Sequence, residues 1–222
     1  MSLVAVLFDL DGTLLDTAPD MVGALDALRC ENGLTPLPFA QVRASVSHGS
    51  GRLVRLGFPD ADTQRQAVLQ RRYLEIYSAE LSANTRLFPG MEAVLAELAA
   101  LRLALGIVTN KPAWLTEPLL RQLGLRDQFV CVVSGDTLSE RKPHPMPLLH
   151  AAKLAGALPP QCLYVGDAER DVQSARAAGM QSVVATYGYL AEGENWRDWG
   201  GDGAIATPQE LLGWLGERGA HE

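Results

Sequence analysis

The stretch LVAVLFDLDGT, residues 3–13, joins an unbroken apolar run to two acidic residues and a glycine. Such a run is typical of a strand that is buried on both faces, as in a parallel sheet. Asp9 and Asp11 follow at the carboxyl end of this strand, where open α/β sheets bind their ligands. The stretch therefore predicts an α/β sheet with an acidic site at one edge.

The rest of the chain alternates short apolar runs with amphipathic segments. Further buried strands are predicted at 103–108, 129–133, 162–165 and 181–185, and helices at 91–101, 113–123, 146–156, 169–178 and 208–217. This alternation is the pattern of parallel βαβ units. We therefore predict an α/β fold with a Rossmann-like parallel sheet as its core.

Residues 17–85 break the alternation. They contain no convincing buried strand, but 20–30 and 63–81 have helical character, and turn signals at Asn32-Gly33 and Gly49-Ser50-Gly51 separate them. We predict an inserted all-helical cap domain over 17–85 and a catalytic core formed by 1–16 and 86–222. The two crossings between them would act as a hinge.

Composition limits the partners of the protein. The 222 residues include 19 Lys and Arg against 26 Asp and Glu, which gives a net charge of -7. This charge argues against nucleic acid or an anionic membrane as a partner, although local donors can still bind an anionic substrate. The chain has no stretch of membrane-spanning length, and its three cysteines are isolated. We expect a cytoplasmic protein that is a monomer.

Asp9 and Asp11 form the first candidate site. Two carboxylates one residue apart can approach the same loop if the backbone turns sharply, which Gly12 permits. Their repulsion has to be relieved by a cation or a shared proton, and a hard ion such as Mg²⁺ binds through oxygen. The alternative is a solvated acidic turn.

A second acidic cluster follows the predicted strand at 162–165. Asp167 lies just past this strand, and Asp171 lies one turn into the next helix. Acidic residues also commonly cap helices, which is the simpler alternative. Acids after two parallel strands nevertheless predict one shared metal site.

Residues of the opposite polarity follow other strands. Thr109 and Asn110 follow the strand at 103–108. They present a hydroxyl and backbone N–H groups at the start of a helix, which is a suitable place for a phosphate oxygen. Lys142 lies in a proline-rich loop before another helix. Each feature alone is more often a turn than a ligand.

In this order the clusters resemble the four motifs of the haloacid dehalogenase-like hydrolase superfamily. The matching residues are Asp9-Leu10-Asp11-Gly12-Thr13, Thr109-Asn110, Lys142 and Gly166-Asp167 with Asp171. The helical insert looks like the cap of the phosphoglycolate phosphatase branch. Thr109-Asn110-Lys111-Pro112, Tyr187-Gly188-Tyr189 and Trp199-Gly200-Gly201-Asp202 also look like the bacterial N-acetylmuramic acid 6-phosphate phosphatases.

The resemblance implies a Mg²⁺-dependent phosphatase that works through an aspartyl-phosphate and acts on a small phosphorylated metabolite. Asp9 would be the nucleophile and Asp11 the general acid and base. Lys142 would pair with both Asp9 and the phosphoryl oxygens. Thr109 and Asn110 would bind phosphoryl oxygens. The metal ligands would be Asp9, the carbonyl of Asp11, Asp167 and, through water or as a support, Asp171.

The cap would select the substrate, and the segment 47–52 is the predicted contact loop. Arg52 would bind a substrate carboxylate there, unless it is only a solvated arginine on a connector. Phosphoglycolate and N-acetylmuramic acid 6-phosphate both carry such a carboxylate. The alternative activities are a dehalogenase, which the acidic pairs argue against, a phosphomutase of the β-phosphoglucomutase type, and a catalytically silent binding protein.

Overall fold

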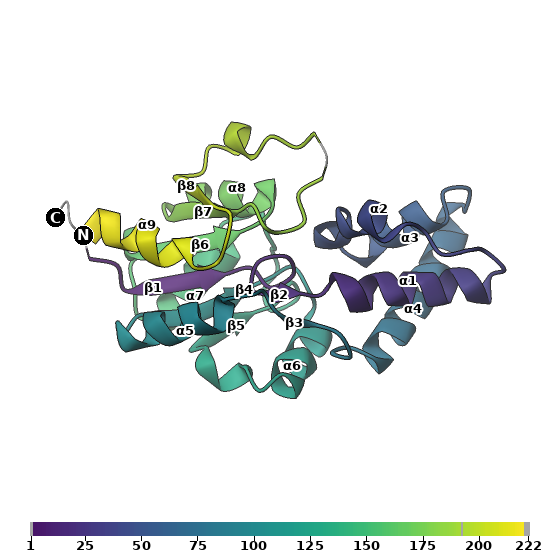
Figure 1. Cartoon of the computed structure of the whole chain (residues 1–222), viewed down its shortest axis with the longest axis horizontal. Coiled ribbons are helices and arrows are strands. Elements are labelled where there is room, and N and C mark those ends of the chain that lie inside the picture. Colours follow the sequence, from purple (N-terminus) through teal and green to yellow (C-terminus); the bar gives the residue numbers. More distant parts are fainter. Residues whose placement is uncertain (1, 192, 220–222) are drawn as a thin grey trace.

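The main feature of the computed structural model, which describes residues 2–191 and 193–219, is a parallel sheet (Figure 1). Its strand order is β5-β4-β1-β6-β7-β8, and every neighbouring pair is parallel. The strands are β1 Ala5–Phe8, β4 Ala104–Val108, β5 Cys131–Val133, β6 Cys162–Gly166, β7 Gln181–Ala185 and β8 Gly203–Ile205. The predicted α/β core is confirmed. The sequence did not predict β8, because three residues that begin with glycine give no clear strand signal.

Helices cover both faces of the sheet, and alternate residues of β1 show which helix packs where. Val6 and Phe8 belong to the same apolar cluster as α5 (Met91–Ala100), α6 (Ala113–Gln122) and α9 (Glu210–Gly219). Ala5 and Leu7 belong to the cluster of α7 (Met146–Leu154) and α8 (Glu169–Ala178). Successive side chains of a strand point to opposite faces, so β1 is buried on both sides.

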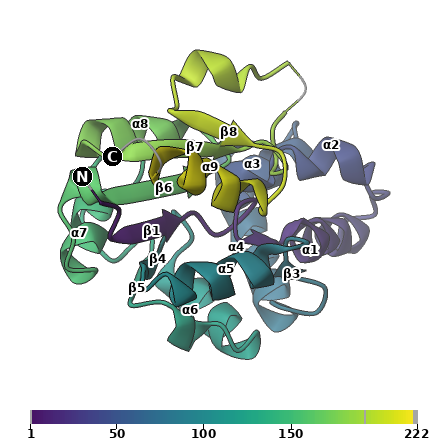
Figure 2. The same ribbon diagram turned by 60° about the vertical axis from the view of Figure 1, so that its left-hand side comes forward.

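The remaining helices form a separate group beyond one end of the sheet, in both views (Figures 1 and 2). These are α1 Ala18–Glu31, α2 Phe39–Arg43, α3 Ser50–Gly57 and α4 Thr63–Ala79. Helix α4 starts where the Asp62 side chain accepts a hydrogen bond of 2.8 Å from the backbone N–H of Arg65. The sequence predicted α1 and α4 but neither α2 nor α3, which are too short to show a clear period.

The prediction of a loop at 47–52 was wrong. A 3₁₀ turn occupies Val46–His48, and α3 begins at Ser50. Gly49 lies between them with a φ of 78°, a conformation that favours glycine. Arg52 therefore lies in the first turn of α3. The next two residues, Leu53 and Val54, are buried and pack this helix against the rest of the helical group.

The two crossings between sheet and helical group lie side by side. Strand β2 (Leu15–Asp16) pairs antiparallel with β3 (Arg86–Leu87). The buried carboxylate of Asp20 in α1 accepts hydrogen bonds from the backbone N–H groups of Asn84 and Thr85 and from both of their side chains, at 2.7–3.0 Å. The hinge and the boundaries at 17 and 85 stay predictions. Among the described residues, no helix has both the length and the apolar character needed to cross a membrane.

We expect Asp20→Ala to lower the free energy of unfolding by about 2–4 kcal/mol, because it leaves the buried backbone N–H and hydroxyl of Thr85 without an acceptor. Chemical denaturation monitored by circular dichroism measures this loss. Asp26→Ala is the matched control on the same helix, since Asp26 accepts a single 3.3 Å bond from the backbone of Leu37. Equal destabilisation by both changes would contradict the prediction.

Candidate active site

The carboxyl ends of three neighbouring strands carry the predicted site residues. Phe8 at the end of β1 pairs with Ile107 of β4 and with Val165 of β6. The residues that follow these strand ends, Asp9 and Asp167 among them, therefore lie at the same edge of the sheet. This edge faces the helical group, which places the site between the two parts of the chain (Figure 1).

Three buried carboxylates meet at this edge. Asp9, Asp167 and Asp171 each offer an oxygen atom, and these atoms lie within 4.8 Å of one another. Burial, together with the charges of Asp9 and Asp171, raises the pKa of Asp167 to about 7. Burial also raises the pKa of Asp171. The cluster is therefore electrostatically unfavourable unless it binds a proton or a cation.

The donor set of this cluster fits a hard divalent cation. Asp171 Oδ2 accepts a hydrogen bond from the backbone of Ala168, whereas its buried Oδ1 accepts none. Lys142 Nζ does lie 2.9 Å from this Oδ1, so the contact is an ion pair without hydrogen-bond geometry. Three buried carboxylates, one with an oxygen that accepts no hydrogen bond, suit Mg²⁺, which binds through oxygen. The side chain of Asp11 is not part of the cluster.

Gly12 allows the chain to pass close to Asp167. Its φ is 88°, and a Cβ atom at this position would lie 2.2 Å from Asp167 Oδ2. No other residue fits there without displacing that carboxylate. The next residue, Thr13, donates a 3.2 Å hydrogen bond from its hydroxyl to Asp167 Oδ1. The turn after β1 therefore supports the acid on β6.

Lys142 supplies the positive charge at the centre of the site. Its fully buried ammonium lies 2.9 Å from Asp9 Oδ1. It also donates hydrogen bonds to the carbonyl of Val108, at 2.8 Å, and to the hydroxyl of Tyr164, at 2.7 Å. These partners fix the ammonium beside Asp9.

Thr109 and Asn110 lie beside this lysine. Asn110 Nδ2 donates a 2.9 Å hydrogen bond to the carbonyl of Lys142, so the amide side chain holds the lysine loop. The buried Thr109 hydroxyl accepts a 3.2 Å bond from the backbone N–H of Lys111. Both residues line the pocket with Asp9 and Asp11. Their predicted contact with phosphate stays a prediction.

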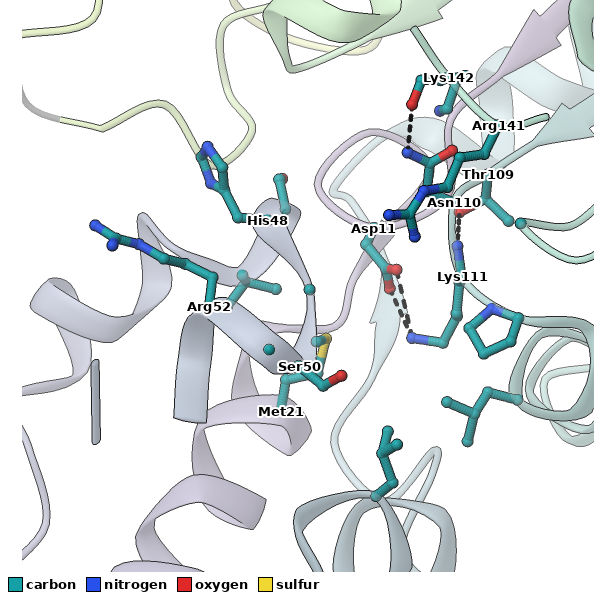
Figure 3. Close-up of a pocket in the computed structure, with 18 of the residues that line it drawn as sticks. Asp11, Met21, His48, Ser50, Arg52, Thr109, Asn110, Lys111, Arg141 and Lys142 are labelled. Carbon is teal, nitrogen blue, oxygen red and sulfur yellow. Dashed lines mark hydrogen bonds and ion pairs between the residues drawn. The ribbon is translucent and has the colours of Figure 1, made fainter. Parts of the chain in front are cut away.

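Asp11 points toward a cation that the sequence analysis did not assign. Lys111 Nζ lies 3.0 Å from Asp11 Oδ1 (Figure 3). It also donates a 2.8 Å hydrogen bond to the hydroxyl of Tyr77 in α4. Burial disfavours the charge of Lys111, but Asp11 and Tyr77 outweigh it and raise the pKa of this lysine. The one local signal is a lysine directly after Thr109-Asn110, and no local pattern indicates its distant partners.

The helical group also contacts the acidic cluster directly. The hydroxyl of Ser47 donates a 2.7 Å hydrogen bond to Asp167 Oδ2, and its carbonyl accepts a 2.8 Å bond from Arg170. Arg170 in turn lies 4.0 Å from Asp9 Oδ2. Sequence reasoning assigned no role to Arg170 and placed Ser47 in the substrate-contact loop without a contact to Asp167, since nothing local links residue 47 to a strand end 120 residues away.

A cavity of about 790 Å³ lies between the sheet edge and the helices. Basic side chains line much of it, namely Arg52, Arg55, Lys111, Arg141, Lys142 and Arg170. This local charge suits an anionic ligand despite the net charge of -7. Arg52 is exposed and directed away from Asp11, whereas Asp11 and Lys111 face each other (Figure 3). The role predicted for Arg52 stays a prediction.

Comparison with known proteins places the chain among hydrolases. The sequence model of the haloacid dehalogenase-like hydrolases matches residues 6–185. A phosphoglycolate phosphatase of Xanthomonas campestris pv. campestris is 44% identical over 207 residues, which cover 93% of this chain and 94% of that protein. An N-acetylmuramic acid 6-phosphate phosphatase of Pseudomonas putida is 37% identical and covers 95% of each chain.

A solved structure shares the arrangement of the elements. The crystal structure of a predicted phosphoglycolate phosphatase from Haemophilus somnus 129pt superposes with a TM-score of 0.85 at 27% identity. The match covers 96% of this chain and 97% of that one. The similarity therefore extends over both the sheet and the helical group.

We expect Mg²⁺ to stabilise the protein more at about pH 8 than at about pH 5.5. The pKa of Asp167, about 7, lies above its ordinary value of 3.8, so the metal-free folded state holds a proton that the unfolded state releases. The stability of the metal-free protein therefore falls as the pH rises from 3.8 to about 7. Above this range the carboxylate is charged, and a bound cation would replace the lost proton. Thermal unfolding with Mg²⁺ or with a chelator measures the difference. Equal stabilisation at both pH values, or an unchanged response in Asp167→Asn, would contradict it.

Proposed function

The chain belongs to the haloacid dehalogenase-like hydrolases, and from this we propose that it hydrolyses phosphate monoesters through an aspartyl-phosphate on Asp9. One observation carries the proposal. The buried carboxylate of Asp9 lies at the pocket beside an ammonium, 2.9 Å from Lys142, and within a cluster of three acids suited to a cation. A carboxylate in this setting can act as a nucleophile toward phosphorus.

The basic groups around Asp9 support the attack. A phosphate dianion repels a carboxylate, so the charges of both have to be balanced before they can meet. Lys142 and Arg170 contact Asp9 at 2.9 and 4.0 Å, and Thr109 lies at the same edge of the sheet. Mg²⁺, held by Asp9, Asp167, Asp171 and the carbonyl of Asp11, would supply further positive charge beside the phosphate.

Asp11 is the proposed general acid and base. Its carboxylate lies outside the acidic cluster and lines the pocket. In the first half of the reaction it would give a proton to the leaving oxygen. In the second half it would take a proton from the water that cleaves the phosphate from Asp9. One carboxylate can serve both steps because the leaving oxygen and the water occupy the same place in turn.

We propose that the helical group, residues 17–85, acts as a cap over the site. Contacts from Ser47 to Asp167 and from Tyr77 to Lys111 join it to the site, which would exclude bulk water from the phosphorylated Asp9. The related phosphatases suggest a small phosphorylated substrate, either phosphoglycolate or N-acetylmuramic acid 6-phosphate. A cytoplasmic location and a monomeric state complete the proposal.

Asp9→Asn is expected to lower Mg²⁺-dependent phosphate release by a factor of roughly a thousand or more, because the amide cannot attack phosphorus. Rapid-quench labelling with a radioactive phosphomonoester should detect phosphate on wild-type Asp9 and none on the variant. Asp198→Asn is the control, since Asp198 is exposed and bonds only to Asn195 near the end of the chain. Phosphate release that survives in Asp9→Asn would refute the nucleophile.

Steady-state kinetics should distinguish the two candidate substrates from phosphate esters that carry no carboxylate. We expect kcat/KM to be higher for phosphoglycolate or for N-acetylmuramic acid 6-phosphate than for hexose phosphates without a carboxylate, because the pocket is lined by basic side chains. The measurement compares all of these esters at one Mg²⁺ concentration. A higher kcat/KM for a hexose phosphate without a carboxylate would contradict both proposed substrates.

A further inference from the structure

Lys111 is a buried cation that connects the proposed general acid to the helical group. Its side chain is 4% exposed, and its ammonium lies 3.0 and 3.4 Å from the two carboxylate oxygens of Asp11. The same ammonium donates to the Tyr77 hydroxyl and lies 4.7 Å from the centre of that ring. All three residues line the pocket. A charge in this position is available to an anionic ligand.

The backbone of Lys111 fixes where its side chain can reach. Its N–H donates a 3.2 Å hydrogen bond to Thr109 Oγ1, and its carbonyl accepts a 2.9 Å bond from the N–H of Gly135. The backbone is thus held in place, and the contacts of the ammonium with Asp11 and Tyr77 position the end of the side chain.

Tyr77 adds a second donor at the same place. Its hydroxyl accepts the bond from Lys111, but it donates no hydrogen bond to any other described residue. Burial raises the pKa of Tyr77, so the hydroxyl keeps its proton. A buried hydroxyl proton without an acceptor is costly, and an anion between Lys111 and Tyr77 would accept it.

We infer that Lys111, with Tyr77, binds the carboxylate of substrates in which this group is attached to the carbon that carries the phosphate ester. The inference rests on the proposed function, in which Asp11 exchanges a proton with the leaving oxygen. That oxygen has to lie within hydrogen-bond distance of Asp11, and Lys111 lies on the same carboxylate. In such substrates only two bonds separate the ester oxygen from the carboxylate carbon, so the carboxylate takes the place of Asp11 as the partner of Lys111.

This geometry distinguishes a nearby carboxylate from a remote one. In a sugar 6-phosphate that carries its carboxylate on another ring substituent, the anion lies several bonds farther from the leaving oxygen. Such an anion would have to reach other cations, such as Arg52 on α3, which points away from Asp11 (Figure 3). Lys111 is therefore the specificity-determining residue for short phosphooxy acids.

The test compares 2-phosphoglycolate with ethyl phosphate, which replaces the carboxylate by a methyl group and yields the same phosphoenzyme. For the wild-type protein we expect kcat/KM to be roughly 10- to 100-fold higher for 2-phosphoglycolate, the effect of charge-assisted hydrogen bonds in a dry site. Lys111→Met should reduce this ratio to within a few-fold of one. Lys153→Met is the matched control, since Lys153 is exposed on α7, and it should keep the wild-type ratio.

Several results would overturn the inference while leaving the phosphatase intact. These are a wild-type ratio near one, an equal loss on both esters in Lys111→Met, and a ratio that collapses in Arg141→Met instead. Dependence on Lys111 for N-acetylmuramic acid 6-phosphate but not for 2-phosphoglycolate would also overturn it. If Lys111→Met does not fold, Tyr77→Phe should still lower the ratio severalfold, and an unchanged ratio counts against the inference. A wild-type protein that releases phosphate from no monoester would instead refute the proposed function.

Discussion

The mutual repulsion of three buried carboxylates is the constraint on which the rest of this structure depends. Asp9, Asp167 and Asp171 are each almost fully removed from water, and their oxygens come within 4.8 Å of one another. Like charges at such distances in a protein interior oppose folding unless a cation balances them. Lys142 provides part of that balance and is itself held by the end of β4 and by Tyr164. The three carboxylates therefore leave a negative charge that Lys142 balances only in part, and a bound metal ion would balance more of it.

The close approach of these groups depends on the order of the strands. Because β1 lies between β4 and β6, its carboxyl end meets a hydroxyl from one neighbour and an acid from the other. The turn at Gly12 then has to pass Asp167 at a distance that leaves no room for a side chain. Parallel strands bring their carboxyl ends to one edge of the sheet, which is why open α/β sheets bind ligands there.

The helical group completes the pocket with contacts that have different partners. Ser47 reaches the acidic cluster, whereas Tyr77 reaches the ion pair between Lys111 and Asp11. Arg43 also donates to the carbonyl of Gly188 on the sheet side. A substrate bound between these contacts would touch both parts of the chain. Under the proposed function, its leaving group would therefore lie where the helical group contacts Asp11 through Lys111.

The sequence by itself determined the parallel core, because continuous apolar runs such as 3–8 have no other stable place than a sheet covered on both faces. It also located Asp9, Asp167 and Lys142, since each follows a strand or precedes a helix in a recognisable local pattern. It missed β2, β3 and β8, whose two or three residues pair only because distant segments meet. It likewise placed Arg52 in a loop and assigned no partner to Lys111. Only the tertiary structure decided that Lys111 faces Asp11 and Tyr77, because long-range contacts across 100 and 34 residues leave no trace in local periodicity.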